Sequence, residues 1–191
     1  LRREPIVSDL TTRFIVPGKT LAEISKLLKE EDEEAYLALS QKHIVFRIGG
    51  YYVVSRLLEG EFLDYNAAIP KVSKTTVKIN TRSLTDAVER TSLLISDRLR
   101  SPIRLSAMDQ KVQLNCSTSM GKAHDEVDCE MSGEAVSMGF NNKYLMDALK
   151  ASDCDMVKLE INGALSPMRI LPLEGEIFLF LVLPVRVKND D

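Results

Sequence analysis

The chain has 191 residues, 45% of them apolar and 28% charged, which is enough to bury the core of one full domain and part of another. A tight duplex binder normally carries a clear basic excess, so with a net charge of −3 any contact with DNA is expected to be loose and confined to one surface. Three widely spaced cysteines and only two histidines argue against a disulfide framework or a zinc site, and they predict reduced thiols in the cytoplasm. No apolar run approaches the roughly 20 residues of a membrane helix, so we expect no membrane contact.

The first part of the chain predicts a strand, a helix and three further strands, in that order. The strand is expected at 12–17, and the helix at 20–30 carries Leu21, Ile24 and Leu28 along one apolar face. The three strands that follow are expected at 34–40, 43–49 and 51–58.

The same order of elements recurs twice. The second copy predicts a strand at 75–80, a helix at 81–96 and strands at 102–108, 111–119 and 124–131. The third copy predicts a strand at 135–141, a helix at 143–151 with Asn142 as its N-cap, and strands at 156–161, 167–173 and 176–187. Three β-α-β-β-β units with single short helices and hairpin-like strands predict an α+β fold with antiparallel sheets.

A break in the strand pattern separates the first unit from the second. The segment EGEFLDYNAAIPKVSK contains Gly60 and Pro70, so we place a linker at 66–72. If two units make one domain, residues 72–191 form a complete domain and residues 1–65 form the second half of another.

No group of residues predicts catalysis, a metal site or a cofactor. The sequence has no phosphate-binding glycine loop, no dinucleotide fingerprint and no HExxH pattern. His43 falls within a predicted strand, and His124 is expected in a hairpin loop, with no recognisable nucleophile beside either. The acidic run 29–34 is interpreted as a solvated turn rather than a carboxylate cage. We therefore expect a protein that is not an enzyme and needs no cofactor.

Four stretches carry a resemblance to a known family, and they occur in the family's order across the whole chain. These are FIVPGKTLAEISKLL (14–28), SRLLEGEFLDYNAAIP (55–70), SGEAVSMGFNNKYLMDAL (132–149) and VLPVRV (182–187). Together they resemble the β subunit of bacterial DNA polymerase III, the sliding clamp. Leu1 resembles the last residue of a T-D-G-H-R-L motif in that family, so the family's first domain is expected to lie before this region.

The resemblance implies a DNA-clamp fold, in which repeated β-α-β-β-β units place antiparallel sheets outside and helices on the inner face of a ring. It implies a cytoplasmic, nucleoid-associated processivity factor that encircles double-stranded DNA without sequence preference. The implied protein partners are the replicative polymerase α subunit, the clamp loader, other proteins with a clamp-binding motif, and a second copy in a full-length homodimer. Without the first domain, this chain alone is expected not to close a ring. The alternative is a clamp-fold interaction module that does not encircle DNA.

Basic residues on the helix faces opposite the apolar stripes are the first candidate surface. By periodicity alone they form an ordinary mixed-charge solvated face, but the resemblance implies that they face DNA. The residues are Lys19, Lys26, Arg82, Arg90, Lys143 and Lys150.

The second candidate surface is an apolar peptide groove that the resemblance places between the two domains. Its residues, carried over one by one, are Leu1, Leu63, Ala67, Ala68, Tyr144, Leu165, Pro167, Leu181, Leu183, Pro184, Val185 and Arg186. Core packing is the alternative for most of them, notably Tyr144 and Leu181. Leu63 stands where the family has proline, Ala67 where some members have arginine, and the tail 188–191 extends past the usual end, so the pocket's shape and polarity are expected to differ.

The third candidate surface is the seam between two copies. The resemblance implies that Leu94 and Ile95 pack against a partner, with core packing as the alternative, and the helical wheel places Leu93 opposite the core. Asp125, Glu126 and Asp128 are interpreted as an acidic edge that pairs with basic residues across the seam.

Overall fold

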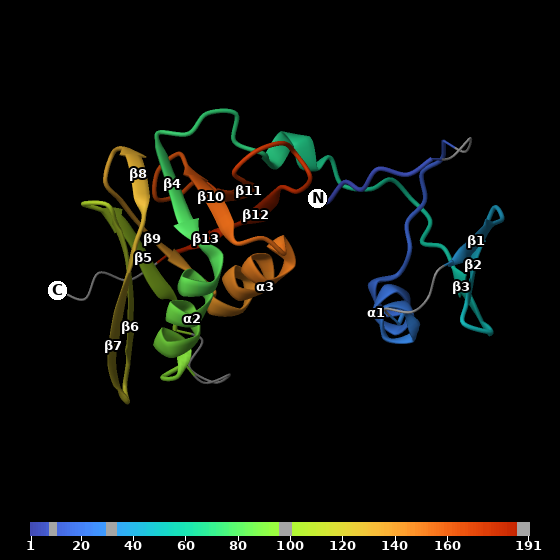
Figure 1. Cartoon of the computed structure of the whole chain (residues 1–191), viewed down its shortest axis with the longest axis horizontal. Helices are drawn as coiled ribbons and strands as arrows, with labels where there is room; N and C mark the ends of the chain where they lie inside the picture. Colours follow the sequence, from blue (N-terminus) through green and yellow to red (C-terminus); the bar gives the residue numbers. More distant parts are fainter. Residues whose placement is uncertain (8–10, 30–33, 96–100, 187–191) are drawn as a thin grey trace. The chain divides into compact units, whose positions relative to one another are not determined.

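The computed structural model describes residues 1–7, 11–29, 34–95 and 101–186, and the chain divides into two compact units (Figure 1). Unit 1 contains Leu1–Pro5 together with the chain from Tyr65 onward, and unit 2 is Ile6–Asp64. The division falls beside the predicted linker at 66–72, whose limits stay a prediction. Among the described residues, no helix is long and apolar enough to cross a membrane.

Unit 2 packs one helix on a three-stranded antiparallel sheet. Its elements are α1 (Gly18–Leu27), β1 (Tyr36–Leu39), β2 (His43–Ile48) and β3 (Tyr51–Arg56), in the sheet order β1-β2-β3. The buried core is formed by Ile24 from the helix and Ile44, Phe46 and Ile48 from the central strand.

Two predictions for unit 2 are wrong. Residues 12–17 form no strand. A strand requires a ladder of backbone hydrogen bonds to a neighbouring strand, whereas within the described chain residues 12–16 have a single one, from Leu58 N to Ile15 O at 2.9 Å. Leu21 and Leu28 are 50% and 46% exposed instead of buried. A sheet of only three strands offers a narrow face, and of the predicted stripe only Ile24 is buried there.

The described part of unit 1 contains two five-stranded antiparallel sheets and two α-helices. One sheet has the order β12-β11-β10-β4-β8, and the other has the order β13-β9-β5-β6-β7. The elements are the short 3-10 helix η1 (Tyr65–Ala68), β4 (Thr75–Asn80), α2 (Thr81–Ser92), β5 (Ile103–Met108), β6 (Lys111–Thr118), β7 (Gly121–Asp128), β8 (Glu130–Gly133), β9 (Val136–Phe140), α3 (Asn142–Ser152), β10 (Met156–Ile161), β11 (Met168–Pro172), β12 (Phe180–Val182) and β13 (Pro184–Val185).

Both sheets of unit 1 combine strands from the second and third sequence repeats. Antiparallel pairing of β4 with β10 joins the repeats in one sheet, and pairing of β5 with β9 joins them in the other. The helices α2 and α3 pack side by side, and both contribute to the core between them and the sheets (Figure 1). The predicted α+β fold class with antiparallel sheets is confirmed.

Asparagine side chains cap the N-termini of α2 and α3. Asn80 Oδ1 accepts a hydrogen bond from Ser83 N at 2.9 Å. At α3, Asn141 Oδ1 accepts from Lys143 N at 3.0 Å and Tyr144 N at 3.4 Å, so the N-cap is Asn141 and the prediction of Asn142 is one residue late.

Two predicted single strands are each divided between the two sheets. The segment predicted as 124–131 becomes β7 and β8, separated at Cys129, whose N–H donates to Gln110 O at 2.9 Å. The segment predicted as 176–187 becomes β12 and β13. Alternation of side chains indicates an extended backbone, but it does not show where a strand changes its neighbour.

Three smaller predictions also differ. His124 lies within β7 and not in a hairpin loop, and its Nδ1 is 2.8 Å from Asn115 Oδ1 on β6. The helix predicted at 81–96 ends at Ser92, and Ser96 lies outside the described residues. Most of the acidic run at 29–34, namely 30–33, also lies outside them, as do 187–191.

Candidate nucleic-acid and protein interfaces

All six predicted DNA-facing residues are exposed on helices. Lys19 and Lys26 lie on α1 of unit 2, and the other four lie on α2 and α3 of unit 1. Three of the six have an acidic partner: Lys26 with Glu23 at 2.8 Å, Arg90 with Asp125 at 2.7 Å and Lys150 with Glu89 at 3.0 Å. Across the described ranges, no ion pair involves Lys19, Arg82 or Lys143.

The acidic partners in these ion pairs offset part of the positive charge of the helix surfaces, but the basic side chains remain exposed. Exposed pairs of this kind contribute roughly 0.2–1 kcal/mol each, so a phosphate can compete for the basic partner. Lys150 of α3 pairs with Glu89 of α2, which places basic residues of both helices on one connected surface of unit 1. Such a surface can attract a polyanion weakly and without reading bases.

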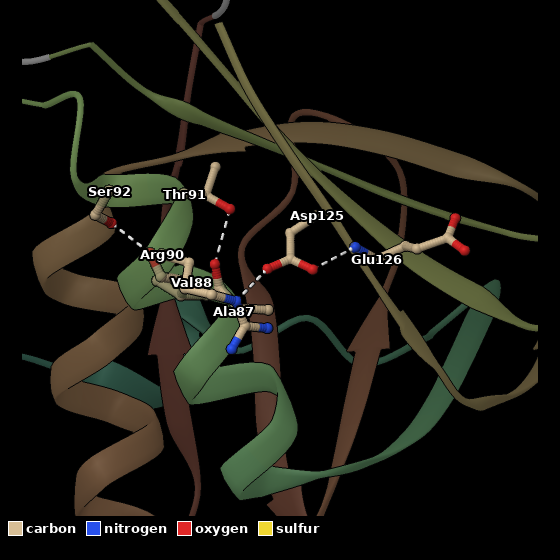
Figure 2. A network of polar contacts seen from close by, with 7 residues as sticks. All are labelled: Ala87, Val88, Arg90, Thr91, Ser92, Asp125 and Glu126. Carbon is tan, nitrogen blue, oxygen red and sulfur yellow. Dashed lines mark hydrogen bonds and ion pairs between the residues drawn. The ribbon is translucent and has the colours of Figure 1, made fainter.

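Arg90 belongs to a polar network that reaches from α2 to the edge strand β7 (Figure 2). Its Nε–H donates to Asp125 Oδ2 at 2.7 Å, and Asp125 Oδ1 accepts the backbone N–H of Glu126 at 2.8 Å. The hydrogen bond with Arg90 lowers the pKa of Asp125, and the same bond raises the pKa of Arg90. At the end of α2, the Thr91 and Ser92 hydroxyls donate to backbone carbonyls of their own helix.

The N-terminus of the chain is hydrogen-bonded to the segment just before β12. Leu1 N donates to Leu179 O, and Leu179 N donates to Leu1 O, both at 2.9 Å. Arg2 forms an antiparallel bridge with Phe178, and Arg3 N donates to Ile177 O at 2.7 Å. Leu1 is therefore held beside the segment that leads into β12, which carries Leu181.

The other predicted groove residues are mostly at the surface. Tyr144, Leu165 and Leu183 are exposed, at 64%, 78% and 67%, which excludes core packing for Tyr144. Those that are half-buried are Pro167, Leu181 and Pro184. Ala67, Ala68, Val185 and Arg186 are exposed in unit 1, whereas Leu63 is exposed in unit 2. The groove as a whole stays a prediction, as do the effects of Leu63, Ala67 and the tail 188–191.

The predicted seam residues divide into one exposed leucine and two half-buried residues. Leu93 is 82% exposed just after α2, whereas Leu94 and Ile95 are half-buried, and Ile95 packs against the core. Met120, in the turn before β7, is 74% exposed, and sequence analysis did not single it out. The sequence feature that would have indicated Met120 is a large apolar residue in the turn between two predicted strands.

The acidic residues of the predicted edge lie on two sides of the edge strand β7, and their pairing across the seam stays a prediction. Side chains alternate along β7, so half-buried Asp125 lies on the side toward α2, while Glu126 and Asp128 lie on the opposite, exposed side. Glu126 also pairs with Lys111 of the neighbouring strand. The strand β7 lies at the edge of its sheet, so the N–H and C=O groups on its outer side pair with no other strand of the described sheet.

Among the residues that the structure describes, no three or more His, Cys, Asp or Glu side chains are grouped so that they could hold a metal ion.

Comparisons with known proteins identify both parts of the chain. Residues 66–186 match the family described as DNA polymerase III beta subunit, C-terminal domain. Residues 4–64 match the family described as DNA polymerase III beta subunit, central domain. The chain belongs to the DNA polymerase III beta subunit family. The predicted resemblance is therefore confirmed.

Relatives of this family are similar over nearly the whole chain. A beta sliding clamp from Staphylococcus aureus is 33% identical over 174 residues, covering 90% of this chain and 46% of the relative. The DNA polymerase sliding clamp of Bacillus subtilis is 30% identical with a TM-score of 0.89, covering 96% of this chain and 49% of that one. The beta chain of Streptococcus pneumoniae DNA polymerase III is 26% identical with a TM-score of 0.82, covering 95% and 50%. The clamp fold is thus confirmed, and the chain spans about half the length of the curated relatives it matches.

Proposed function

We propose that this chain is part of a DNA sliding clamp, a processivity factor that encircles duplex DNA and tethers the replicative polymerase to it. The observation that carries the proposal is the match of both consecutive beta-subunit domains, in the family's order, to a chain with the clamp fold. The protein has an accessory role, and the polymerase supplies the chemistry. Its place of action is the bacterial cytoplasm, at the nucleoid.

The mixed charges of the helix surface suit sliding. A closed ring cannot fall off circular DNA, so retention does not depend on the strength of contacts. Lys19, Arg82 and Lys143 have no ion-pair partner in the described parts of the chain, and the paired bases are exposed. Contacts from these residues to phosphates would be few, weak, salt-dependent and indifferent to sequence.

The exposed apolar residues near β12 and β13 are proposed to bind short motifs of the polymerase α subunit, the clamp loader and other clamp-binding proteins. Leu1, Leu181 and Leu183 supply apolar surface, and Tyr144 adds an aromatic side chain at the first turn of α3. A short peptide that buries a few side chains here binds at about micromolar strength after ordering costs. That strength permits exchange of partners.

Leu93 and the edge of β7 are proposed as the seam with a second copy of the full-length protein. Leu93 is 82% exposed, so a partner that covers it would remove apolar surface from water. The open edge of β7 provides backbone groups that a strand of the partner can pair with.

The test is retention on DNA whose topology is changed. Full-length protein is loaded by its clamp loader onto nicked circular DNA, the circle is separated from free protein, and the DNA is then linearised. A ring stays on the circle and leaves the linear molecule by its ends. Equal retention on both forms contradicts encirclement, and absence from both favours the alternative, an interaction module with a clamp fold.

A further inference from the structure

The hydrogen bond between Arg90 and Asp125 leaves the two Nη groups of the arginine available for another contact. The bond to Asp125 uses Nε, and Figure 2 shows both Nη atoms of Arg90 directed away from the carboxylate. The Arg90 side chain is 59% exposed, whereas that of Asp125 is only 21% exposed. The guanidinium is therefore held at its inner edge, and the amino groups that most readily bind a phosphate remain accessible.

Asp125 is itself held firmly. Its second oxygen accepts the backbone N–H of Glu126, so the carboxylate is attached to the backbone of β7, and it faces α2. A long arginine side chain loses considerable rotamer freedom when it binds a ligand. A carboxylate that already restricts the side chain reduces that loss, which is how preorganisation strengthens binding.

From this geometry we propose that Asp125 is a positioning residue that orients the Nη groups of Arg90 toward a DNA phosphate. The inference rests on the proposed function, and it assigns Asp125 a role within its own subunit in place of pairing across the seam. Because Asp125 belongs to an edge strand, phosphate contact through Arg90 depends on the position of β7. The lowered pKa of Asp125 agrees with a carboxylate that stays charged beside Arg90.

The opposite effect is also physically reasonable, and the two can be separated. If Asp125 only neutralised Arg90, removing its charge would strengthen DNA binding. If it orients Arg90, removing it weakens binding, and Asp125→Asn retains part of the effect because the amide oxygen can still accept the Nε–H hydrogen bond.

The experiment measures binding of full-length protein to a short fluorescent duplex over a range of salt concentrations. Arg90→Ala is expected to weaken binding several-fold and to reduce the salt slope by about 0.9, the value for one phosphate contact. Asp125→Ala is expected to weaken binding about twofold to threefold, with Asp125→Asn between it and the unsubstituted protein. In the Arg90→Ala background, Asp125→Ala is expected to have no further effect, because it acts through Arg90.

Glu130→Gln is the matched control, since it removes an exposed ion pair, with Lys78, that lies outside the three candidate surfaces, and it is expected to leave DNA binding unchanged. Thermal melting confirms that each variant is folded. If Arg90→Ala weakens binding but Asp125→Ala does not, or strengthens it, the positioning role is wrong while the proposed function stands. If Arg90→Ala has no effect, the inference and the DNA-facing role of α2 at this residue are both wrong.

Discussion

Lys150 of α3 and Glu89 of α2 form an ion pair across the two helices of unit 1, with Nζ 3.0 Å from Oε1. The side chains are 60% and 53% exposed, so water screens the pair and its contribution to stability is small. The main effect of this ion pair is to position the ammonium group of Lys150, on α3, beside α2.

Charge reversal on the helices should weaken DNA contact without changing sequence preference. Lys26→Glu with Lys150→Glu is expected to lower clamp loading and processivity, and to reduce the salt slope of DNA binding by about two, because two phosphate contacts become repulsive. Lys78→Glu is the control, because Lys78 also pairs with a glutamate but lies on an exposed position of β4. Unchanged retention of the double variant on circular DNA would remove the assignment of both lysines.

Truncation of Leu183 should weaken peptide binding more than folding. Leu183→Ala is expected to lower affinity for a clamp-binding pentapeptide of the Q-L-x-L-F type roughly tenfold, since loss of an anchoring side chain commonly costs about 1–2 kcal/mol. Leu183 is exposed, so the melting temperature should change little. Fluorescence anisotropy measures the affinity, with Leu173→Ala as a control for an exposed leucine outside the predicted groove. Equal losses in both variants would argue against a specific groove.

Substitution of two similarly exposed leucines, Leu93 and Leu165, should distinguish the seam from the groove. Leu93→Ser is expected to raise the dimer dissociation constant of the full-length protein at least tenfold and to leave peptide affinity unchanged, because a covered leucine contributes about 1.5–3 kcal/mol. Leu165→Ser is expected to weaken peptide binding and to leave the dimer dissociation constant unchanged. Analytical ultracentrifugation and peptide titration give the two readouts. Loss of both activities in either variant would indicate general unfolding.

Gly133 should be irreplaceable, unlike another glycine with the same backbone angle. Gly133 has φ +100°, and a Cβ there would lie 1.9 Å from the backbone oxygen of Lys74. Gly163 has φ +102° but open space around it. Gly133→Ala is therefore expected to destabilise unit 1 by more than about 3 kcal/mol, and Gly163→Ala by about 1–2 kcal/mol. Urea denaturation measures both, and similar costs would contradict the close approach.

The Asp125–Arg90 pair should contribute to stability only above acidic pH. The folded-state pKa of Asp125 is lowered, chiefly by the hydrogen bond from Arg90, so its contribution is full above the unfolded value of about 3.9. It is lost as the pH falls below that value and through the folded pKa. Asp125→Asn should thus lower the melting temperature modestly at neutral pH, and the difference should shrink progressively as the pH falls below about 3.9. A difference that is constant across this range would show that charge is not the cause.

Local sequence predicted the elements whose identity depends on their own residues. The helix α2 has Leu84, Ala87 and Val88 on one face, and all three are buried. The strands β5 and β6 alternate buried and half-buried side chains, so their pattern also matched the structure. Four short motifs were sufficient to indicate the family, because their order along the chain is specific.

Only the tertiary structure decided which elements meet. The division of one predicted strand into β7 and β8 depends on pairing with β6 and β4, which lie far apart in the chain. Exposure of Leu21 and Leu28 depends on how much sheet α1 can cover. The bond between Arg90 and Asp125 joins residues 35 positions apart. Periodicity describes one element at a time, whereas burial, sheet membership and ion pairing depend on neighbours that the folded chain brings together.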